Sequence, residues 1–202
     1  MAISEQLKEL NLISGKKLCT IFDRIFDDVL TLDYGKPSSF IDTMWERYEN
    51  SEVSLNGSVF EGLLATVFYR EGIVPLFVQA KLTFVPNIDF DFVAYSTQRG
   101  PIVISAKTSL RERYKQADLE GMMLRHVHRR SESYLITMHV AEAARVNAKI
   151  AIGQSLGIDK VVVANSIEFD GLIDHLKTYN YVIPDKVDVL TSSRVIVPNA
   201  IM

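Results

Sequence analysis

The sequence predicts an α/β fold in which a mixed β-sheet is sandwiched by helices. Apolar residues recur near a 3.6-residue period through the first third of the chain, which is typical of amphipathic helices. Between Val74 and Leu110, short runs rich in Val, Ile and Phe indicate strands. In the second half, strand-like runs alternate with helix-like runs, and this alternation places helices against the faces of a sheet.

A helical N-terminal part is expected over residues 1–56, with one further helix opening the α/β core. Apolar positions at helical spacing predict helices within Leu7–Val29, Phe40–Tyr48 and Ser58–Gly72. Gly35-Lys36-Pro37 separates the first of these from the second.

Three strands joined by short turns are expected next, as an antiparallel meander. They cover Leu76–Phe84, Ile88–Tyr95 and Ile102–Ala106. Pro86-Asn87 and the run from Gln98 to Pro101 supply the turn residues. Ser109-Leu110-Arg111-Glu112 then has the form of a capping box, so a helix is expected to begin there and to run to about His126.

The rest of the chain completes one domain. Strands and helices are expected to alternate over Tyr134–Met138, Ala141–Ile152, Lys160–Ala164 and Ile167–Lys177. A chain of 202 residues fits a single domain that buries roughly 70% of its unfolded surface. We expect its α/β core over residues 57–180 and a C-terminal tail with strands over residues 181–202.

The composition, 48% hydrophobic and 23% charged, is that of a compact globular protein. Cys19 is the single cysteine, so no intrachain disulfide can form and we expect a reducing, cytoplasmic environment. No apolar run reaches about 18 residues, which argues against a membrane role.

The net charge of −3 argues at first against a nucleic-acid partner, but the charge is unevenly distributed. The segment Lys107–Arg130 holds seven basic residues against three acidic ones. A solvated helix face accounts for such a run equally well on charge alone. The residues inside the run therefore decide between the two interpretations.

Two aspartates share one face of the second expected strand. In Ile88-Asp89-Phe90-Asp91-Phe92, alternation puts the apolar side chains on one face and both aspartates on the other. If the following turn is centred near residue 99, Asp91 lies opposite Lys107. A plain cross-strand ion pair, worth ~0.2–1 kcal/mol, is the simplest interpretation. The pair also suits phosphodiester hydrolysis, in which the acid holds Mg²⁺ and the lysine orients or deprotonates the attacking water.

A second acid is needed, because one carboxylate alone is a poor Mg²⁺ site. Ser105 stands two residues before the lysine, where we would first look for it. From a helix start at Ser109, the side chains of Arg113, Gln116 and Glu120 fall on one face. Glu120 is therefore a candidate for the missing ligand and Arg113 for a phosphate contact.

These residues resemble the PD-(D/E)xK nuclease superfamily, and especially type II restriction endonucleases. Asp91, the turn and Ile102–Lys107 are similar to the core hairpin of that superfamily. The run KTSLRERYKQ, which starts at Lys107, is similar to a subgroup whose second acid has moved onto the helix after the lysine. In that subgroup a functional arginine follows the lysine by six residues and the relocated glutamate by thirteen, which here are Arg113 and Glu120.

The resemblance implies a restriction-endonuclease-like core and Mg²⁺-dependent, site-specific cleavage of double-stranded DNA by a homodimer. Asp91 and Glu120 would hold the metal, Lys107 would activate water and Arg113 would position a phosphate. Asp89 is a further metal ligand in this scheme. A shift of the assumed turn centre by one or two residues would reopen the choice between Asp89 and Asp91 as the principal ligand.

Glu61 is a further candidate by resemblance, because the superfamily often brings an acid to the metal from this helix. Ser58-Val59-Phe60-Glu61 also has the form of a capping box, so its carboxylate fits a bond to the Ser58 amide equally well. Glu112 is interpreted as a capping residue of the helix after Lys107.

DNA contacts are expected from basic and polar side chains that follow the lysine, namely Arg111, Lys115, Gln116, Arg125, His128 and Arg129. Two other functions stay open. One is a repair or recombination nuclease, such as a junction resolvase, with the same core. The other is a non-catalytic DNA-binding subunit of a larger nuclease, in which Ser105 marks a decayed site.

Overall fold

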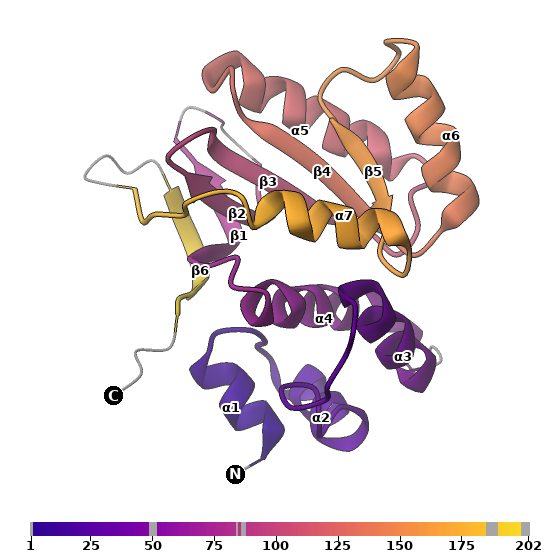
Figure 1. Cartoon of the computed structure of the whole chain (residues 1–202), viewed down its shortest axis with the longest axis vertical. Coiled ribbons are helices and arrows are strands. Elements are labelled where there is room, and N and C mark those ends of the chain that lie inside the picture. The colour runs from indigo at the N-terminus through magenta and orange to yellow at the C-terminus, as the bar shows by residue number, and fades with distance from the viewer. Residues whose placement is uncertain (1, 49–51, 84, 86–87, 185–189, 199–202) are drawn as a thin grey trace.

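A six-stranded mixed sheet forms the centre of the computed structural model, which describes residues 2–48, 52–83, 85, 88–184 and 190–198 (Figure 1). The strands are β1 (Leu76–Leu82), β2 (Phe90–Ser96), β3 (Gly100–Ala106), β4 (Glu132–Thr137), β5 (Lys160–Val163) and β6 (Leu190–Ile196). Their order is β5-β4-β3-β2-β1-β6. The β3–β4 and β4–β5 pairs are parallel, and the other pairs are antiparallel.

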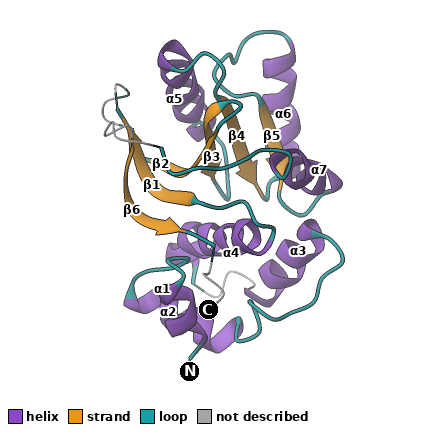
Figure 2. Ribbon diagram, turned by 60° about the vertical axis from the view of Figure 1, so that its left-hand side comes forward, coloured by secondary structure: helices purple, strands orange, loops and turns teal. Residues whose placement is uncertain are grey.

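Helices cover both faces of this sheet (Figure 2). They are α1 (Ile3–Glu9), α2 (Lys16–Ile25), α3 (Pro37–Tyr48), α4 (Asn56–Arg70), α5 (Arg113–Val127), α6 (Val140–Ala151) and α7 (Ile167–Leu176), with a short 3₁₀ helix at Val53–Leu55. One apolar cluster joins α5 and α6 to the sheet, and a larger one joins α3, α4 and α7 to its other face. Helices α1 and α2 pack beneath α4, away from the sheet. The predicted mixed sheet between helices is confirmed.

The parallel strand β4 shows how the sequence fills both apolar layers. All six of its residues are buried, as expected of a parallel strand that is covered on both faces. Leu135 packs with the α5–α6 cluster, whereas its neighbours Tyr134 and Ile136 pack with the larger cluster. Because successive side chains of a strand point to opposite faces, this one buried strand contributes side chains to both apolar layers.

Several boundaries differ from the prediction. The first expected helix is split into α1 and α2, because Asn11 and Gly15 take positive φ angles of 59° and 92° between them. In the described part of the tail, the strand β6 pairs antiparallel with β1. Phe84 and the turn residues Pro86 and Asn87 lie outside the described residues.

The expected capping box at Ser109 is wrong. Helix α5 begins at Arg113, and its N-cap position is Glu112, whose side chain makes no capping bond. The Glu142 carboxylate instead accepts hydrogen bonds from the Leu110 amide at 2.5 Å and the Ser109 hydroxyl at 3.4 Å. An acid that is remote in sequence therefore holds this segment as a turn, and the N-cap position lies three residues later than expected.

Helix α5 is fixed in place by the loop between α6 and β5. The Asp118 carboxylate accepts hydrogen bonds of 2.7 Å from the Ser155 hydroxyl and from the Gly157 amide. Gly121 and Gly157 allow the two backbones to approach, because a Cβ atom added at Gly121 would collide with the Gly157 carbonyl.

Within the described ranges, no helix has the length and apolar content needed to cross a bilayer.

The close approach at Gly121 predicts opposite effects for two helical glycines. Gly121→Ala should destabilise the protein by about 1–3 kcal/mol, since backbone atoms would have to move apart. Gly171→Ala in α7 should stabilise it by about 0.5–1 kcal/mol, because no atom lies within 4 Å of the added Cβ and alanine favours the helix. Urea denaturation measures both changes, and equal effects of the two substitutions would contradict the close contact.

Candidate active site

A buried carboxylate and a lysine meet at one end of the β2–β3 hairpin. Asp91 is 7% exposed. Its Oδ2 accepts a hydrogen bond of 2.7 Å from the Lys107 ammonium and one of 2.8 Å from the Ala106 amide. The Lys107 amide donates at 2.9 Å to the Ile136 carbonyl on β4, which fixes the backbone that carries the lysine. Three adjacent strands therefore position this pair.

The register that brings the pair together differs from the predicted one. Phe92 pairs with Ile104, so the hairpin is centred on residue 98 and not on residue 99. Continued by one step, this register puts Asp91 opposite Ser105, with Lys107 as its diagonal neighbour. Diagonal neighbours are within reach of long side chains, so the lysine still contacts the acid.

Asp89 lies outside this contact. It is paired at 3.5 Å with Lys81 of β1, and both side chains are more than half exposed. The structure therefore brings Asp91, and not Asp89, to the lysine.

Glu61 lies in the second turn of α4, and the charges of Asp91 and Lys107 both affect it. Its Oε2 accepts a hydrogen bond of 3.3 Å from the Gln79 side chain. The pKa of Glu61 is raised to about 7, first by burial and then by the negative charge of Asp91, whereas Lys107, Arg194 and the hydrogen bond from Gln79 oppose the shift. The capping interpretation of Glu61 is wrong, because α4 begins at Asn56 and has no side-chain cap.

Gln79 reaches Glu61 because of an irregularity in β1. Its φ angle is 49°, in the left-handed region that non-glycine residues rarely adopt. Phe77 and Ala80 consequently belong to one apolar cluster and Val78 to another, whereas regular alternation would put Val78 and Ala80 on the same face. Non-glycine residues in this conformation concentrate at functional sites.

Glu120 is a third carboxyl group whose pKa is affected by the charges of Asp91 and Lys107. It lies on α5 and accepts a hydrogen bond of 2.7 Å from the Gln116 side chain. Burial raises the pKa of Glu120, and this hydrogen bond and Lys107 oppose the rise, whereas Asp91 and Asp89 add to it. Glu120 and Glu61 are thus both subject to the charges of Asp91 and Lys107, although they come from helices on opposite faces of the sheet.

Carboxylate oxygens are the ligands that a hard divalent cation prefers. Among the described residues, no group of three or more His, Cys, Asp or Glu side chains is arranged so that it could hold a metal ion. Mg²⁺ does not need such a group, because it is usually held by one or two carboxylates, several waters and substrate phosphates. Both hydrogen bonds from described residues to Asp91 end on Oδ2, which leaves Oδ1 for a further ligand.

A cavity of about 710 Å³ lies beside Lys107 and Glu61, whereas Asp91 and Glu120 are not among its lining residues. Glu61, Lys107, Arg111 and Arg113 all contribute to its wall. Arg111 and Arg113 are exposed, so their guanidinium groups are available to an anionic ligand. Of the other residues expected to bind DNA, Lys115 forms an ion pair with Glu112, and Gln116 is the hydrogen-bond donor to Glu120.

The remaining three expected DNA contacts lie elsewhere. Helix α5 has 15 residues, so its ends are roughly 22 Å apart, and Arg129 and His128 follow its far end. The pKa of His128 is lowered by burial, and its Nε2 is buried without a hydrogen-bond partner among the described residues. Arg125 binds Asp159 and donates at 2.7 Å to the Leu156 carbonyl. Its guanidinium therefore joins α5 to the neighbouring loop instead of facing the cavity.

Comparison with known proteins identifies the fold. No protein-family model and no curated protein sequence matches the chain significantly. Among solved structures, the chain resembles the restriction endonuclease PspGI in its complex with substrate DNA, with a TM-score of 0.52 and 17% sequence identity. The likeness covers 93% of this chain and 83% of the other. The chain has the restriction-endonuclease fold.

Within this restriction-endonuclease fold, two residues of the site were not predicted from the sequence. Gln79 is a polar residue inside the apolar run Phe77-Val78-Gln79-Ala80, and that position was the available signal. Arg194 lies on β6, and its side chain acts electrostatically on Glu61. No sequence pattern indicated that Arg194 belongs to the site, because the pairing of the C-terminal strand with β1 is a tertiary feature.

The raised pKa of Glu61 predicts a specific pH dependence of stability without metal. Between pH 4.5 and about 7 the folded protein keeps a proton that the unfolded chain has released, so stability falls as the pH rises through this window. Glu61→Gln removes this loss. The variant should gain roughly 2 kcal/mol relative to wild type between pH 5 and pH 8.

Urea denaturation in EDTA at several pH values measures this difference. Glu9→Gln, at an exposed position of α1, is the control. Parallel stability curves for wild type and Glu61→Gln would show that the Glu61 carboxyl group titrates normally.

Proposed function

We propose that this chain is a type II restriction endonuclease that hydrolyses phosphodiester bonds of double-stranded DNA at a specific sequence and depends on Mg²⁺. The observation that carries this proposal is the buried contact between Asp91 and Lys107, with Glu61 and Glu120 close enough to be affected by both charges. The restriction-endonuclease fold supports it, since the similar structure is that of an enzyme bound to its substrate DNA.

Each residue of the site has a chemical role in this reaction. Asp91 and Glu120 would hold Mg²⁺, with Asp89 as a more distant acid. When bound, Mg²⁺ supplies charge stabilisation at the phosphate under attack. Lys107 orients the attacking water through its ammonium group. Glu61 suits proton transfer, because a pKa of about 7 lies near the working pH of a general base.

The DNA is bound on the side where the cavity opens. Arg111 and Arg113 contact phosphates there, and a guanidinium group matches a phosphate through two parallel hydrogen bonds. Lys115 adds positive charge beside them. This local charge accounts for DNA binding by a chain whose net charge is −3, because phosphate contacts depend on the nearby surface.

Removing the lysine should abolish cleavage. Lys107→Ala is expected to reduce the rate of plasmid cleavage in Mg²⁺ by at least about 10²-fold, the size of a lost acid–base or positioning group. Lys160→Ala is the matched control, because Lys160 is also paired with a carboxylate but lies on the edge strand β5. Wild type and both variants are compared by gel assay, and equal rates for Lys107→Ala and wild type would exclude the catalytic role.

Glu120 should act through the metal. Glu120→Gln keeps the size of the side chain but removes its charge, so the Mg²⁺ concentration for half-maximal cleavage should rise by about tenfold or more. A titration of cleavage rate against Mg²⁺ measures this shift. A lower maximal rate with an unchanged Mg²⁺ requirement would place Glu120 outside the metal site.

Cleavage of both DNA strands at one site favours a two-fold homodimer. Analytical ultracentrifugation should therefore find a species of twice the 22.8 kDa chain mass. Digestion of linear duplex and of branched DNA, followed by sequencing of the ends, separates a restriction enzyme from a junction resolvase. Binding without Mg²⁺-dependent cleavage of either substrate would instead indicate a non-catalytic subunit.

A further inference from the structure

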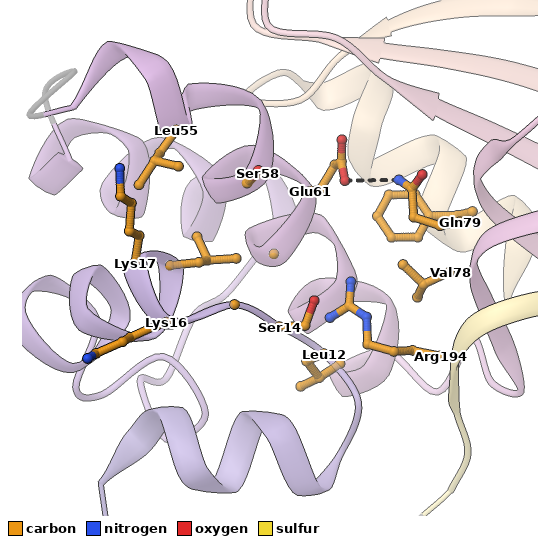
Figure 3. Close-up of a pocket in the computed structure, with 14 residues that line it drawn as sticks. Leu12, Ser14, Lys16, Lys17, Leu55, Ser58, Glu61, Val78, Gln79 and Arg194 are labelled. Atoms are coloured by element: carbon orange, nitrogen blue, oxygen red, sulfur yellow. Dashed lines mark hydrogen bonds between the residues drawn. The ribbon is translucent and has the colours of Figure 1, made fainter.

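A second cavity, of about 590 Å³, shares Glu61 with the first as a lining residue (Figure 3). It is enclosed by the start of α2, by α4 and by the paired strands β1 and β6. Its polar lining consists of Ser14, Lys16, Lys17, Ser58, Glu61, Gln79 and Arg194. Glu61 also lines the cavity that holds Lys107, so its side chain stands between the two spaces.

Arg194 is the cation inside this cavity. It lies on β6 opposite Val78 of β1, and its guanidinium group extends into the cavity on the side of Glu61 (Figure 3). Its Nη1 is buried and has no hydrogen-bond partner among the described residues. Burial lowers the pKa of Arg194, but an arginine stays protonated in proteins. A buried donor on a charged group is costly when it is unpaired, which points to an anionic ligand.

The charge around the cavity is positive. Three cations, Lys16, Lys17 and Arg194, line it together with one carboxyl group, that of Glu61. Both lysines are exposed, so their charges add to the positive potential at the opening of the cavity. The balance therefore favours a ligand with at least one negative charge.

The position of the cavity indicates which anionic ligand it takes. Phosphates of one DNA strand follow each other at about 3.4 Å of rise along the helix axis. A strand whose scissile phosphate lies at Lys107 must therefore place neighbouring phosphates close by. Glu61 borders both spaces, so the cavity is the adjoining position for the same strand.

We propose that Arg194 binds a backbone phosphate that neighbours the scissile one on the same DNA strand, and that Lys16 and Lys17 of the cavity lining add positive charge there. This inference rests on the proposed function. The planar guanidinium group is suited to it, because its fork matches phosphate oxygens in a way that a lysine does not. The C-terminal strand thereby becomes part of the DNA-binding surface.

The test measures DNA binding without cleavage. Fluorescence anisotropy in EDTA follows a labelled duplex of mixed sequence between about 50 and 200 mM salt. Arg194→Met should reduce the slope of log K against log salt by about 1, the loss of one phosphate contact, and weaken binding by about tenfold. Arg24→Met, at an exposed position of α2 outside the cavity lining, is the control and should bind like wild type.

Two outcomes overturn the proposal. One is a folded Arg194→Met protein, judged by circular dichroism, that has the affinity and salt slope of wild type. If that variant does not fold, Arg194→Lys decides, because it keeps the charge and loses the fork. It should keep the slope and bind more weakly by about threefold to tenfold, and an unchanged affinity overturns the phosphate contact.

The same experiment separates this site from the proposed function. Wild type that binds no DNA would overturn both. A reduced slope for Arg194→Met in a protein that never cleaves DNA would support the phosphate site and overturn the endonuclease assignment.

Discussion

The contact between Asp91 and Lys107 is the interaction on which the rest of the candidate site depends. A carboxylate that is 7% exposed loses most of its hydration, which costs several kcal/mol unless other groups replace the water. The Lys107 ammonium and the Ala106 amide provide that replacement on the same oxygen. Since the lysine backbone is itself held by β4, the pair requires β2, β3 and β4 to be assembled in register.

The raised pKa of Glu61 is due mainly to the burial of its own side chain, and Asp91 of the buried pair adds to it. Burial disfavours the charged form, and the Asp91 charge disfavours it further. Gln79, Lys107 and Arg194 oppose this effect from three different strands or strand ends. The proton affinity of Glu61 is therefore a property of the assembled sheet and α4 together. A proton acceptor that works near neutral pH can arise in this way without any special local sequence.

Helix α5 connects the site to the rest of the fold. Asp118 and Arg125 tie it to the loop before β5, and the glycine contact at Gly121 sets how closely it approaches. Those contacts determine where Glu120 lies relative to the hairpin. The helix also separates the basic residues after Lys107 into two places. Arg111 and Arg113 line the cavity, whereas Arg129 lies beyond the far end of α5.

The sequence by itself determined the class of fold, because helical and strand periodicities in the apolar residues are local properties. It also placed Asp91 near Lys107, since a short hairpin tolerates an error of one residue in its centre when the side chain is as long as lysine. The tertiary structure alone decided what depends on distant segments. Glu142 set the start of α5, Gln79 oriented Glu61, and the pairing of β6 with β1 brought Arg194 to the site, because each of these contacts joins residues that are remote along the chain.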